Sequence, residues 1–392
     1  MTTEPPPLQV LLLNWRDIRN PEGGGSERYV ERVAAGLAAA GHTVTIFCAA
    51  HQDAPRDEHR DGIRYVRRGN RLTVYPRALI ALATRRLGRP DVVVDTQNGF
   101  PFFARVATRR PVVVLVHHVH REQWPVVFGP RLARFGWWVE SWLAPRVFRG
   151  CQYVAVSEST RRELAGLGVD RRTIAVVHNG TEPVAHLALP RGASPEVVVL
   201  GRLVPHKRVD HALEVVAKLR AEIPAMRLTV VGDGWWAGQL HADAERLGLT
   251  EVVEFTGHVD EAVKHRHLAR AWAMALPSLK EGWGLAVLEA AAHGVPTVAY
   301  RSAGGVTESV VDGVSGMLVD DSVDAMAAAL RTLLTDAAVR TAMSQGAREH
   351  AVGFTWAQTT ASFERVLRDV LAGQRHGDSD PAVDSSDGQL LP

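Results

Sequence analysis

Short runs of Val, Ile and Leu alternate along this chain with longer stretches in which apolar residues recur at helical spacing. Strands that alternate with helices are typical of βαβ units, so the pattern predicts parallel sheets covered by helices. The first series of predicted strands is Val10–Leu13, Thr43–Cys48, Gly62–Val66, Val92–Asp95, Val112–Val116 and Tyr153–Val156. A second series is Glu196–Leu200, Arg227–Val231, Val252–Thr256, Trp272–Leu276 and Thr297–Tyr300. We therefore expect two doubly wound α/β domains facing a central cleft, with ligands at the carboxyl ends of the strands.

The segment Pro183–Pro195 separates the two series. It contains three prolines and one glycine and has no helical period, which is typical of a linker. The predicted parts are an N-terminal domain over 1–182, a linker over 183–195, a C-terminal domain over 196–355, a C-terminal helix over 356–373 that packs back on the N-terminal domain, and a disordered, acidic tail over 374–392. Helices are also predicted at Arg28–Ala40, Val323–Leu334 and Ala337–His350.

The composition excludes several classes of protein. Two cysteines, Cys48 and Cys151, among 392 residues exclude a disulfide scaffold and a multi-cysteine zinc module, and they fit a reducing compartment. The apolar runs are far shorter than the roughly 20 residues of a membrane span. The polar, proline-rich start at Thr2–Pro7 differs from a signal peptide. We expect a cytoplasmic location, including the cytoplasmic face of the membrane.

The net charge of +2 conceals an asymmetry between the two halves. Residues 1–190 hold 26 Lys and Arg against 17 Asp and Glu, and none of the 26 is a lysine. Residues 191–392 hold 19 against 26. A basic half indicates an anionic partner such as a membrane surface or a nucleic acid, and scattered solvated arginines are the alternative explanation.

Two loops follow the opening strands of the predicted domains. The first is the glycine loop Gly23-Gly24-Gly25-Ser26-Glu27, which precedes a predicted helix. Its glycines allow a ligand to approach the backbone closely, and the helix N-terminus offers N–H groups to a phosphate. A flexible loop without a function would have the same composition. In the second domain, Gly201–Arg208 places an Arg and a Lys at the carboxyl end of a strand. These cations can neutralise a diphosphate, and a solvated loop is the alternative.

The most specific motif is Glu281–Glu289, in which two carboxylates bracket a glycine-rich turn that opens a helix continuing to Ala292. The turn offers N–H groups to a phosphate, and the second glutamate is expected roughly two turns into the helix. Carboxylates suit sugar hydroxyls because they accept hydrogen bonds from two at once. Two glutamates on a helix face by chance are the alternative.

As a set, five elements of this chain resemble family 4 retaining glycosyltransferases of the GT-B fold. They are the Glu281–Glu289 element, the loop Gly201–Arg208, the stretch Phe255–Glu261, the tripeptide His178–Gly180 and the glycine loop. The resemblance runs from about Leu8 to Leu371, and the arrangement is similar to that of phosphatidylinositol mannosyltransferases. It implies an enzyme that moves a hexose, with mannose as a candidate, from a GDP- or UDP-sugar to a hydroxyl of a lipid or a lipid-linked glycan, and no cofactor.

The resemblance also implies roles for individual residues. Arg202 and Lys207 would bind the donor diphosphate, with Gly24 and Gly25 beside it from the other domain, and Glu281 would hold the sugar. Glu289 would bind the ribose, and His258 and Val259 would contact the nucleobase. The phosphates would face the turn formed by Gly282, Trp283, Gly284 and Leu285. The resemblance implies a catalytic role for four residues, which are His117, Glu281, Arg202 and Lys207. His118 is the alternative to His117 as the histidine beside the donor sugar.

The cluster His117, His118 and His120, with Glu122 close by, raises the question of a metal site. Adjacent residues at a strand end point to opposite faces, which disfavours a compact tetrahedral site. Asp378-Ser379-Asp380 has the D-x-D pattern of metal-dependent transferases of another fold, but it lies in the predicted tail. We therefore expect no metal, and the resemblance implies same-face transfer in which the leaving diphosphate helps to deprotonate the acceptor. No carboxylate is evident as a nucleophile of the kind used by retaining glycosidases.

Tryptophans and arginines alternate in the segment Arg121–Arg149, which holds Trp124, Trp137, Trp138 and Trp142. This composition is typical of an interfacial helix on anionic lipid, and filling of the domain core is the alternative. Tyr75–Arg89 is a second segment of this kind.

Three rival functions remain at this stage: a nucleotide-sugar 2-epimerase of the same fold, a nucleic-acid-binding protein, and a donor-binding subunit without catalytic activity. The Glu281–Glu289 element with the loop Gly201–Arg208 disfavours the epimerase, and nucleic acid is not an expected partner.

Overall fold

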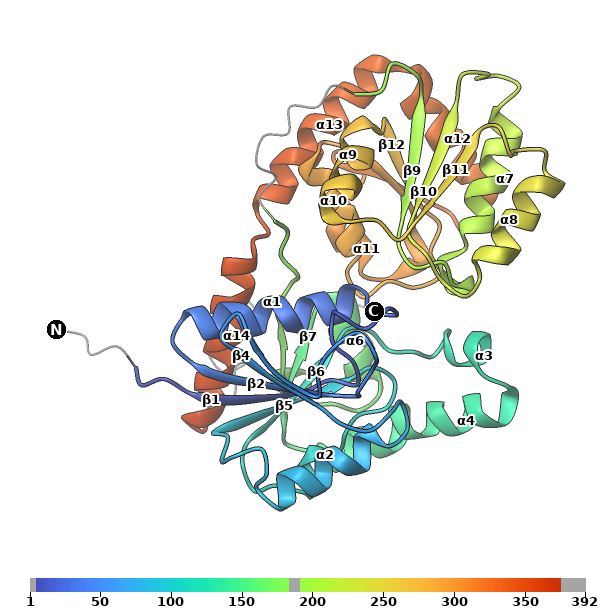
Figure 1. The fold of residues 1–392 in the computed structure, drawn as a ribbon. Helices are drawn as coiled ribbons and strands as arrows, with labels where there is room; N and C mark the ends of the chain where they lie inside the picture. The colour runs from blue at the N-terminus through green and yellow to red at the C-terminus, as the bar shows by residue number, and fades with distance from the viewer. Residues whose placement is uncertain (1–4, 183–190, 375–392) are drawn as a thin grey trace, which may run out of the picture. The chain divides into compact units, whose positions relative to one another are not determined.

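The computed structural model describes residues 5–182 and 191–374, which form two compact units (Figure 1). Unit 1 comprises the described residues up to His178 together with those from Trp356 onward, and unit 2 comprises those from Asn179 to Thr355. The division therefore falls a few residues before the predicted boundary at 182. Most of the predicted linker and almost all of the predicted tail lie outside the described residues.

Unit 1 is built on an eight-stranded sheet in the order β3-β4-β2-β1-β5-β6-β7-β8. All neighbouring strands are parallel except β3 and β4. The strands are β1 (Gln9–Leu13), β2 (Thr43–Cys48), β3 (Asp57–Arg60), β4 (Ile63–Arg67), β5 (Val92–Gln97), β6 (Val112–Val116), β7 (Gln152–Ala155) and β8 (Ile174–Val176). The order reverses between β1 and β5, so the unit is doubly wound.

Helices cover both faces of this sheet, with α1 and α14 on one face and α2 on the other (Figure 1). The central strands β5 and β6 are buried along their whole length, which explains why each begins with a run of three valines. The helices of unit 1 are α1 (Gly25–Ala39), α2 (Val74–Ala83), α3 (Trp124–Val127), α4 (Pro130–Trp138), the π-helical turn η2 (Val139–Leu143), α5 (Ala144–Val147), α6 (Glu158–Gly166) and α14 (Trp356–Leu371).

Unit 2 contains a six-stranded, wholly parallel sheet in the order β11-β10-β9-β12-β13-β14, whose order reverses between β9 and β12. The strands are β9 (Glu196–Leu200), β10 (Arg227–Val231), β11 (Val253–Gly257), β12 (Ala273–Leu276), β13 (Thr297–Tyr300) and β14 (Gly316–Val319). The helices are α7 (Val209–Leu219), α8 (Ala237–Arg246), α9 (Glu261–Arg270), α10 (Leu285–Ala292), α11 (Val306–Ser309), α12 (Val323–Thr335) and α13 (Ala337–Val352).

The C-terminal helix α14 packs along α1 within unit 1. Phe363 of α14 is fully buried, and its ring contacts Tyr29 of α1 at 6.3 Å between centroids. The helices approach closely at Gly36, where an added Cβ would lie 2.3 Å from Thr360 Oγ1. The chain therefore returns to its first sheet after completing unit 2.

Candidate active site

The two predicted motifs of unit 2 meet at the point where the strand order reverses. The loop after β9 carries Arg202 and leads into the 3₁₀ turn η4 (Pro205–Lys207), and the loop after the neighbouring strand β12 carries Glu281. Lys207 Nζ donates a hydrogen bond to Glu281 Oε1 at 2.5 Å, between side chains that are 22% and 11% exposed. Because ligands of doubly wound sheets bind at such reversal points, this ion pair marks the candidate donor site.

The backbone of Glu281 is held on both sides. Its N–H donates to Ala303 O at 2.8 Å, and its carbonyl accepts from the N–H of Gly305 at 3.0 Å. A Cβ added to Gly305 would lie 1.9 Å from the carbonyl oxygen of Gly282, so a glycine is required for this approach. Lys280, the buried neighbour of Glu281, was not assigned any role from the sequence.

The glycine-rich turn opens α10 as expected. Gly284 is the N-cap residue with φ of +88°, a left-handed conformation that favours glycine, and Leu285 is the first helical residue. Trp283 is only 2% exposed, and its ring contacts Phe354 at 5.1 Å between centroids. The indole of Trp283 therefore packs inside unit 2, and only its backbone remains available to a donor.

Glu289 is the fifth residue of α10, so it lies just over one turn into the helix, and the expectation of roughly two turns is wrong. Its Oε1 accepts a hydrogen bond from Lys264 Nζ at 2.8 Å. Lys264 lies on α9, is 6% exposed and also pairs with Glu261. The sequence analysis did not identify Lys264, because only the fold brings α9 beside α10.

His258 and Val259 form the connection between β11 and α9. Val259 packs against an apolar cluster of unit 2, and His258 is exposed. Their place beyond the carboxyl end of a parallel strand agrees with a ligand-facing position, while the nucleobase contact stays a prediction.

In unit 1, the glycine loop lies between β1 and α1, and Gly25 is the first residue of the helix. The carboxylate of Glu27, which is 1% exposed, accepts a hydrogen bond from the Gly24 N–H at 2.8 Å. Glu27 also accepts one from Arg16 Nε at 3.0 Å. The loop is therefore anchored, and one of the N–H groups at the start of α1 is already used by the protein.

His117 directly follows β6 and is 5% exposed. Its ring meets Tyr29 edge-on, with 5.2 Å between centroids, and its buried Nε2 has no hydrogen-bond partner among the described residues. Burial lowers the pKa of the His117 imidazole to about 4, partly offset by the negative charge of Glu27. The ring is therefore neutral at physiological pH and keeps one nitrogen for a further hydrogen bond.

The other two histidines have structural partners. His118 Nε2 lies 3.0 Å from Gln123 Oε1, and His120 Nδ1 lies 3.0 Å from the buried carboxylate of Glu140. Glu140 also accepts from Trp124 Nε1 at 2.7 Å. In the described parts of the chain, no group of three or more His, Cys, Asp or Glu side chains is arranged to hold a metal ion.

The tryptophans of the segment Arg121–Arg149 divide into two pairs. Trp124 is buried and Trp137 packs against the core of unit 1, whereas Trp138 and Trp142 are each 44% exposed. No helix within residues 5–182 or 191–374 is long and apolar enough to cross a membrane.

The two doubly wound units have the GT-B fold, which the chain shares with solved glycosyltransferase structures. Residues 23–184 match the family model described as "Glycosyltransferase Family 4", and residues 189–350 match "Glycosyl transferases group 1". A GDP-mannose-dependent alpha-(1-6)-phosphatidylinositol monomannoside mannosyltransferase of Mycolicibacterium smegmatis is 31% identical over 91% of this chain and 89% of its own length. The chain belongs to the family 4 glycosyltransferases.

Two further similarities support this assignment. A glycogen synthase of Mycobacterium tuberculosis is 29% identical over 94% of this chain and 96% of its own length. The solved structure of sucrose-phosphate synthase from Thermosynechococcus elongatus superposes with a TM-score of 0.78 at 20% identity, covering 93% of this chain and 100% of that one. The protein is therefore a hexosyltransferase that takes its sugar from a nucleotide-linked donor.

Proposed function

We propose that this enzyme is a retaining, metal-independent hexosyltransferase whose donor is bound by unit 2. The Lys207–Glu281 pair carries the proposal, because a cation and a carboxylate lie 2.5 Å apart at the reversal point of the sheet, where ligands of such sheets bind. Arg202 and Lys207 bind the donor diphosphate, and Glu281 binds hydroxyls of the transferred sugar. The ribose is held by Glu289, and the nucleobase lies against His258 and Val259.

In this mechanism, the bond between the anomeric carbon and the diphosphate oxygen breaks while the acceptor oxygen bonds to the same face of that carbon. The proton of the acceptor hydroxyl moves to the departing diphosphate, which leaves with its bonding electron pair. Arg202, Lys207 and the N–H groups of Gly284 and Leu285 stabilise the charge that develops on the diphosphate. From unit 1, Gly24, Gly25 and the neutral imidazole of His117 are the proposed contacts to the donor.

The experiment is a transfer assay on Lys207→Met and Glu281→Gln. We expect Lys207→Met to lower kcat by about 100-fold or more, as for the loss of a group that stabilises a developing anion. We expect a loss of similar size in Glu281→Gln, because the amide no longer accepts hydrogen bonds from two sugar hydroxyls as the carboxylate does. The matched controls are Lys218→Met and Asp324→Asn, which break an exposed ion pair of 2.8 Å on the same unit. Near-normal kcat in Lys207→Met or Glu281→Gln contradicts the site, and the anomeric configuration of the product tests retention.

For the donor sugar we propose mannose, since a relative that covers most of this chain is named a GDP-mannose-dependent enzyme. A ligand that binds only the native state raises the apparent thermal stability. Thermal shifts with GDP-mannose, UDP-glucose and ADP-glucose therefore rank the donors. The largest shift is expected with GDP-mannose, and a larger shift with UDP-glucose or ADP-glucose assigns glucose instead.

The acceptor proposal is a lipid or lipid-linked glycan at the cytoplasmic face of the membrane, reached through α4 and η2. Phe135, Trp138 and Trp142 form a continuous exposed aromatic row, with 6.0 Å and 5.3 Å between successive ring centroids. The arginines of the segment Arg121–Arg149 are Arg121, Arg131, Arg134, Arg146 and Arg149, and of its two carboxylates Glu140 is buried and Glu122 is exposed. Exposed aromatic rings beside arginines are suited to an anionic bilayer interface.

Sedimentation with vesicles of phosphatidylglycerol and phosphatidylcholine tests this surface. We expect binding that weakens with salt and that falls at least fivefold in Trp138→Ser/Trp142→Ser. The control is Trp235→Ser, an exposed tryptophan of unit 2. Equal sedimentation with neutral and anionic vesicles would exclude the preference for anionic lipid. Equal sedimentation of Trp138→Ser/Trp142→Ser and Trp235→Ser would exclude the aromatic row as the contact.

A further inference from the structure

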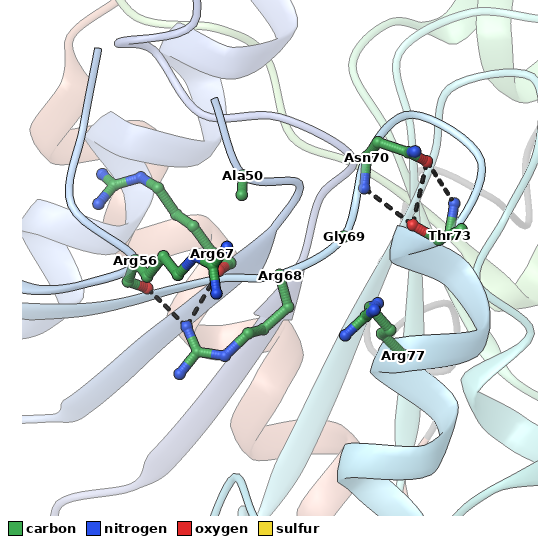
Figure 2. Close-up of a pocket in the computed structure, with 8 residues that line it drawn as sticks. All are labelled: Ala50, Arg56, Arg67, Arg68, Gly69, Asn70, Thr73 and Arg77. Carbon is green, nitrogen blue, oxygen red and sulfur yellow. Dashed lines mark hydrogen bonds between the residues drawn. The ribbon is translucent and has the colours of Figure 1, made fainter. Parts of the chain in front are cut away.

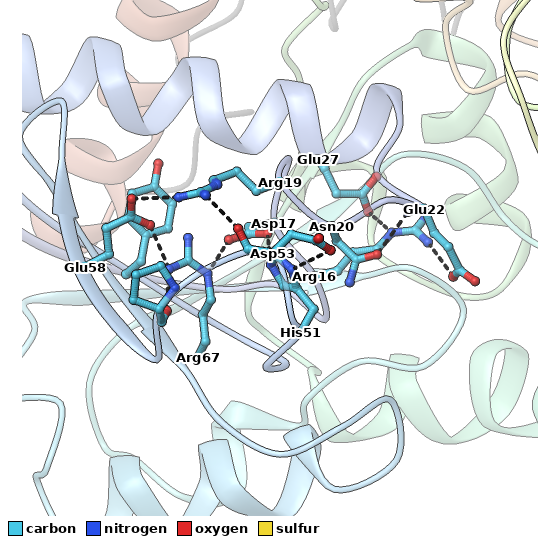
Figure 3. A network of polar contacts seen from close by, with 12 residues as sticks. Arg16, Asp17, Arg19, Asn20, Glu22, Glu27, His51, Asp53, Glu58 and Arg67 are labelled. Carbon is cyan, nitrogen blue, oxygen red and sulfur yellow. Dashed lines mark hydrogen bonds and ion pairs between the residues drawn. The ribbon is translucent and has the colours of Figure 1, made fainter. Parts of the chain in front are cut away.

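Arginines tie both predicted donor loops to neighbouring segments of the chain. In unit 1, Arg67 at the end of β4 lines a pocket of about 380 Å³ (Figure 2). Its Nε donates to Asp17, in the loop after β1, at 2.6 Å (Figure 3). In unit 2, Arg208 ends the loop after β9, and its guanidinium pairs with Asp321. Arg208 directly follows Lys207, so this second pair lies next to a proposed ligand of the diphosphate.

The backbone of Arg208 is strained. Its φ of +48° and ψ of +43° define the left-handed conformation, which a Cβ disfavours and which glycine adopts freely. The described residues include four non-glycine residues with positive φ, which are Asp61, Arg85, Phe103 and Arg208. Of these, Arg208 is the one adjacent in sequence to a proposed donor residue. Such a conformation persists where the surrounding structure holds it in place.

Segments after β13 and β14 hold the Arg208 side chain. Asp321, in the segment after β14, pairs with the guanidinium and accepts a hydrogen bond from Ser302 Oγ at 3.4 Å. The guanidinium also lies 6.0 Å from the ring centroid of Tyr300, the last residue of β13. Tyr300 is completely buried, and its hydroxyl lies 2.8 Å from His211 Nδ1 on α7. Both partners of the guanidinium are therefore themselves anchored.

The conformation at Arg208 sets the direction in which the turn η4 ends. The Arg208 N–H donates to Pro205 O at 3.0 Å, and its carbonyl accepts from the His211 N–H at 3.0 Å, so the turn ends and α7 begins at this residue. On the other side of Lys207, His206 O accepts from the Leu279 N–H at 2.8 Å, which joins η4 to the loop that carries Glu281. A rotation about the Arg208 backbone would therefore move Lys207 relative to Glu281.

Stability does not explain why this position holds an ion-paired arginine. A glycine would adopt the same backbone conformation without a partner, whereas an arginine needs one that holds it. The side chains of Arg208 and Asp321 are 25% and 34% exposed, and ion pairs at such positions add little to the free energy of unfolding because water screens them. The pair therefore acts on position rather than on stability.

We propose that Arg208 and Asp321 are positioning residues for the donor diphosphate. Their pair holds the backbone after Lys207 in the left-handed conformation, and this conformation fixes the place of Lys207 Nζ. The inference rests on the function proposed above, in which Lys207 binds the diphosphate, and it adds two residues that act through Lys207 without touching the donor.

Calorimetry with GDP and UDP tests the proposal, on whichever of the two nucleotides binds the wild type more tightly. Asp321→Asn removes the charge of the pair at constant size, and we expect Kd to rise about tenfold, because Lys207 no longer meets the diphosphate in the right geometry. Arg208→Ala removes the pair from the other side and keeps a Cβ that disfavours positive φ, so the same rise is expected.

Glycine provides the rescue. Arg208→Gly and Asp321→Asn/Arg208→Gly have no Cβ at the strained position, so both should bind the nucleotide within about twofold of the wild type. Glycine is also accepted as the N-cap residue of α7. If Arg208 instead binds the diphosphate through its own charge, Arg208→Gly loses as much affinity as Arg208→Ala, and the positioning role is overturned.

Two matched controls leave the contacts of Lys207 and Arg208 intact. Arg85→Gly replaces an exposed arginine that has φ of +58° just after α2, and Asp324→Asn breaks the exposed Lys218–Asp324 pair of 2.8 Å. Neither should change Kd, and urea denaturation should show that every variant is folded. A rise in Kd in Asp324→Asn equal to that in Asp321→Asn would overturn the proposal.

A double variant separates this inference from the proposed function. If Arg208 and Asp321 act through Lys207, Asp321→Asn should add no further loss of affinity to Lys207→Met. A further tenfold loss in that double variant overturns the positioning role alone, and so does an unchanged Kd in Asp321→Asn when Lys207→Met weakens binding. Unchanged binding in Lys207→Met contradicts the proposed donor site itself.

Discussion

At the scale of single residues, a buried polar group depends on the hydrogen-bond partners that the fold supplies. His117 and Glu140 both lie in unit 1, and they differ in these partners. Burial lowers the pKa of the His117 ring, whose Nε2 has no hydrogen-bond partner among the described residues. Glu140 is completely buried, and it accepts hydrogen bonds from His120 and Trp124. The neutral imidazole suits a contact to an uncharged sugar hydroxyl.

The lowered pKa of His117 predicts a pH dependence of stability. The unfolded state, with the ordinary pKa of 6.5, binds more protons than the folded state between pH 6.5 and about 4, so the free energy of unfolding falls as the pH falls through this window. The contribution of His117 is at most about 3 kcal/mol. His117→Gln should flatten the curve from urea denaturation between pH 4 and 7. The exposed His59→Gln should leave it unchanged, and an unaltered curve in His117→Gln contradicts the assignment.

Glu140 predicts a second residue-scale effect. In Glu140→Ala, the His120 N–H, the His120 ring and the Trp124 indole N–H all lose their acceptor, with an expected cost of about 3 kcal/mol in the free energy of unfolding. Glu140→Gln keeps the shape and one acceptor and should cost less. Urea denaturation measures both, and an unchanged midpoint in Glu140→Ala would refute the structural role of this carboxylate.

At the scale of elements, strands buried on both faces were predictable because their composition is continuous and apolar. β2, β6, β9, β10 and β13 have the predicted bounds. β3, Asp57–Arg60, was missed because an antiparallel edge strand with four polar residues carries no apolar pattern. β8, with three residues, is too short for a period to be recognised, and β14 was also missed. α1 begins three residues before the predicted Arg28 because its N-cap is a glycine.

The start of α10 yields an element-scale prediction. Gly284→Ala places a side chain at φ of +88° and 3.1 Å from Val287 Cγ2, which should cost about 1 to 2 kcal/mol. Because the helix start positions the candidate phosphate-binding amides, kcat should fall as well. The control is Gly238→Ala on α8, where no atom lies within 4 Å of the added Cβ and stability should be equal or slightly higher. Thermal melts and transfer assays measure the stability and the kcat of both variants. Equal stability and equal kcat of Gly284→Ala and Gly238→Ala would contradict the role of Gly284 at the helix start.

At the scale of the whole molecule, the chain completes its first unit only after it has made its second. α14 buries Phe363 against α1, so unit 1 requires residues that are far away in the sequence. Deleting α14 would expose the apolar face of α1 and is expected to cause aggregation. The C-terminal helix is thus part of the structure of unit 1.

Phe363→Ala tests this dependence. Removal of a completely buried phenylalanine typically costs 3 to 5 kcal/mol, through lost burial and a residual cavity, and we expect a loss of about that size. Leu371→Ala, at the partly exposed end of α14, should cost less than about 1 kcal/mol. Urea denaturation followed by circular dichroism measures the free energy of unfolding of both variants. Equal losses in Phe363→Ala and Leu371→Ala would show that the packing of α14 adds little to the stability of unit 1.

The amino-acid sequence by itself determined the alternation of strands and helices, the two-domain plan and the residues of the candidate donor motifs. These properties are carried by local periodicity and by motifs a few residues long. The tertiary structure alone decided the pairing of Lys207 with Glu281 across 74 positions, the partner Lys264 of Glu289, and the burial of Trp124 but not Trp138. It also gathered Arg56, Arg67, Arg68 and Arg77 around one pocket. The physical reason is that burial and ion pairing depend on which strands become neighbours, and many sequences with the same local pattern could pair their loops differently.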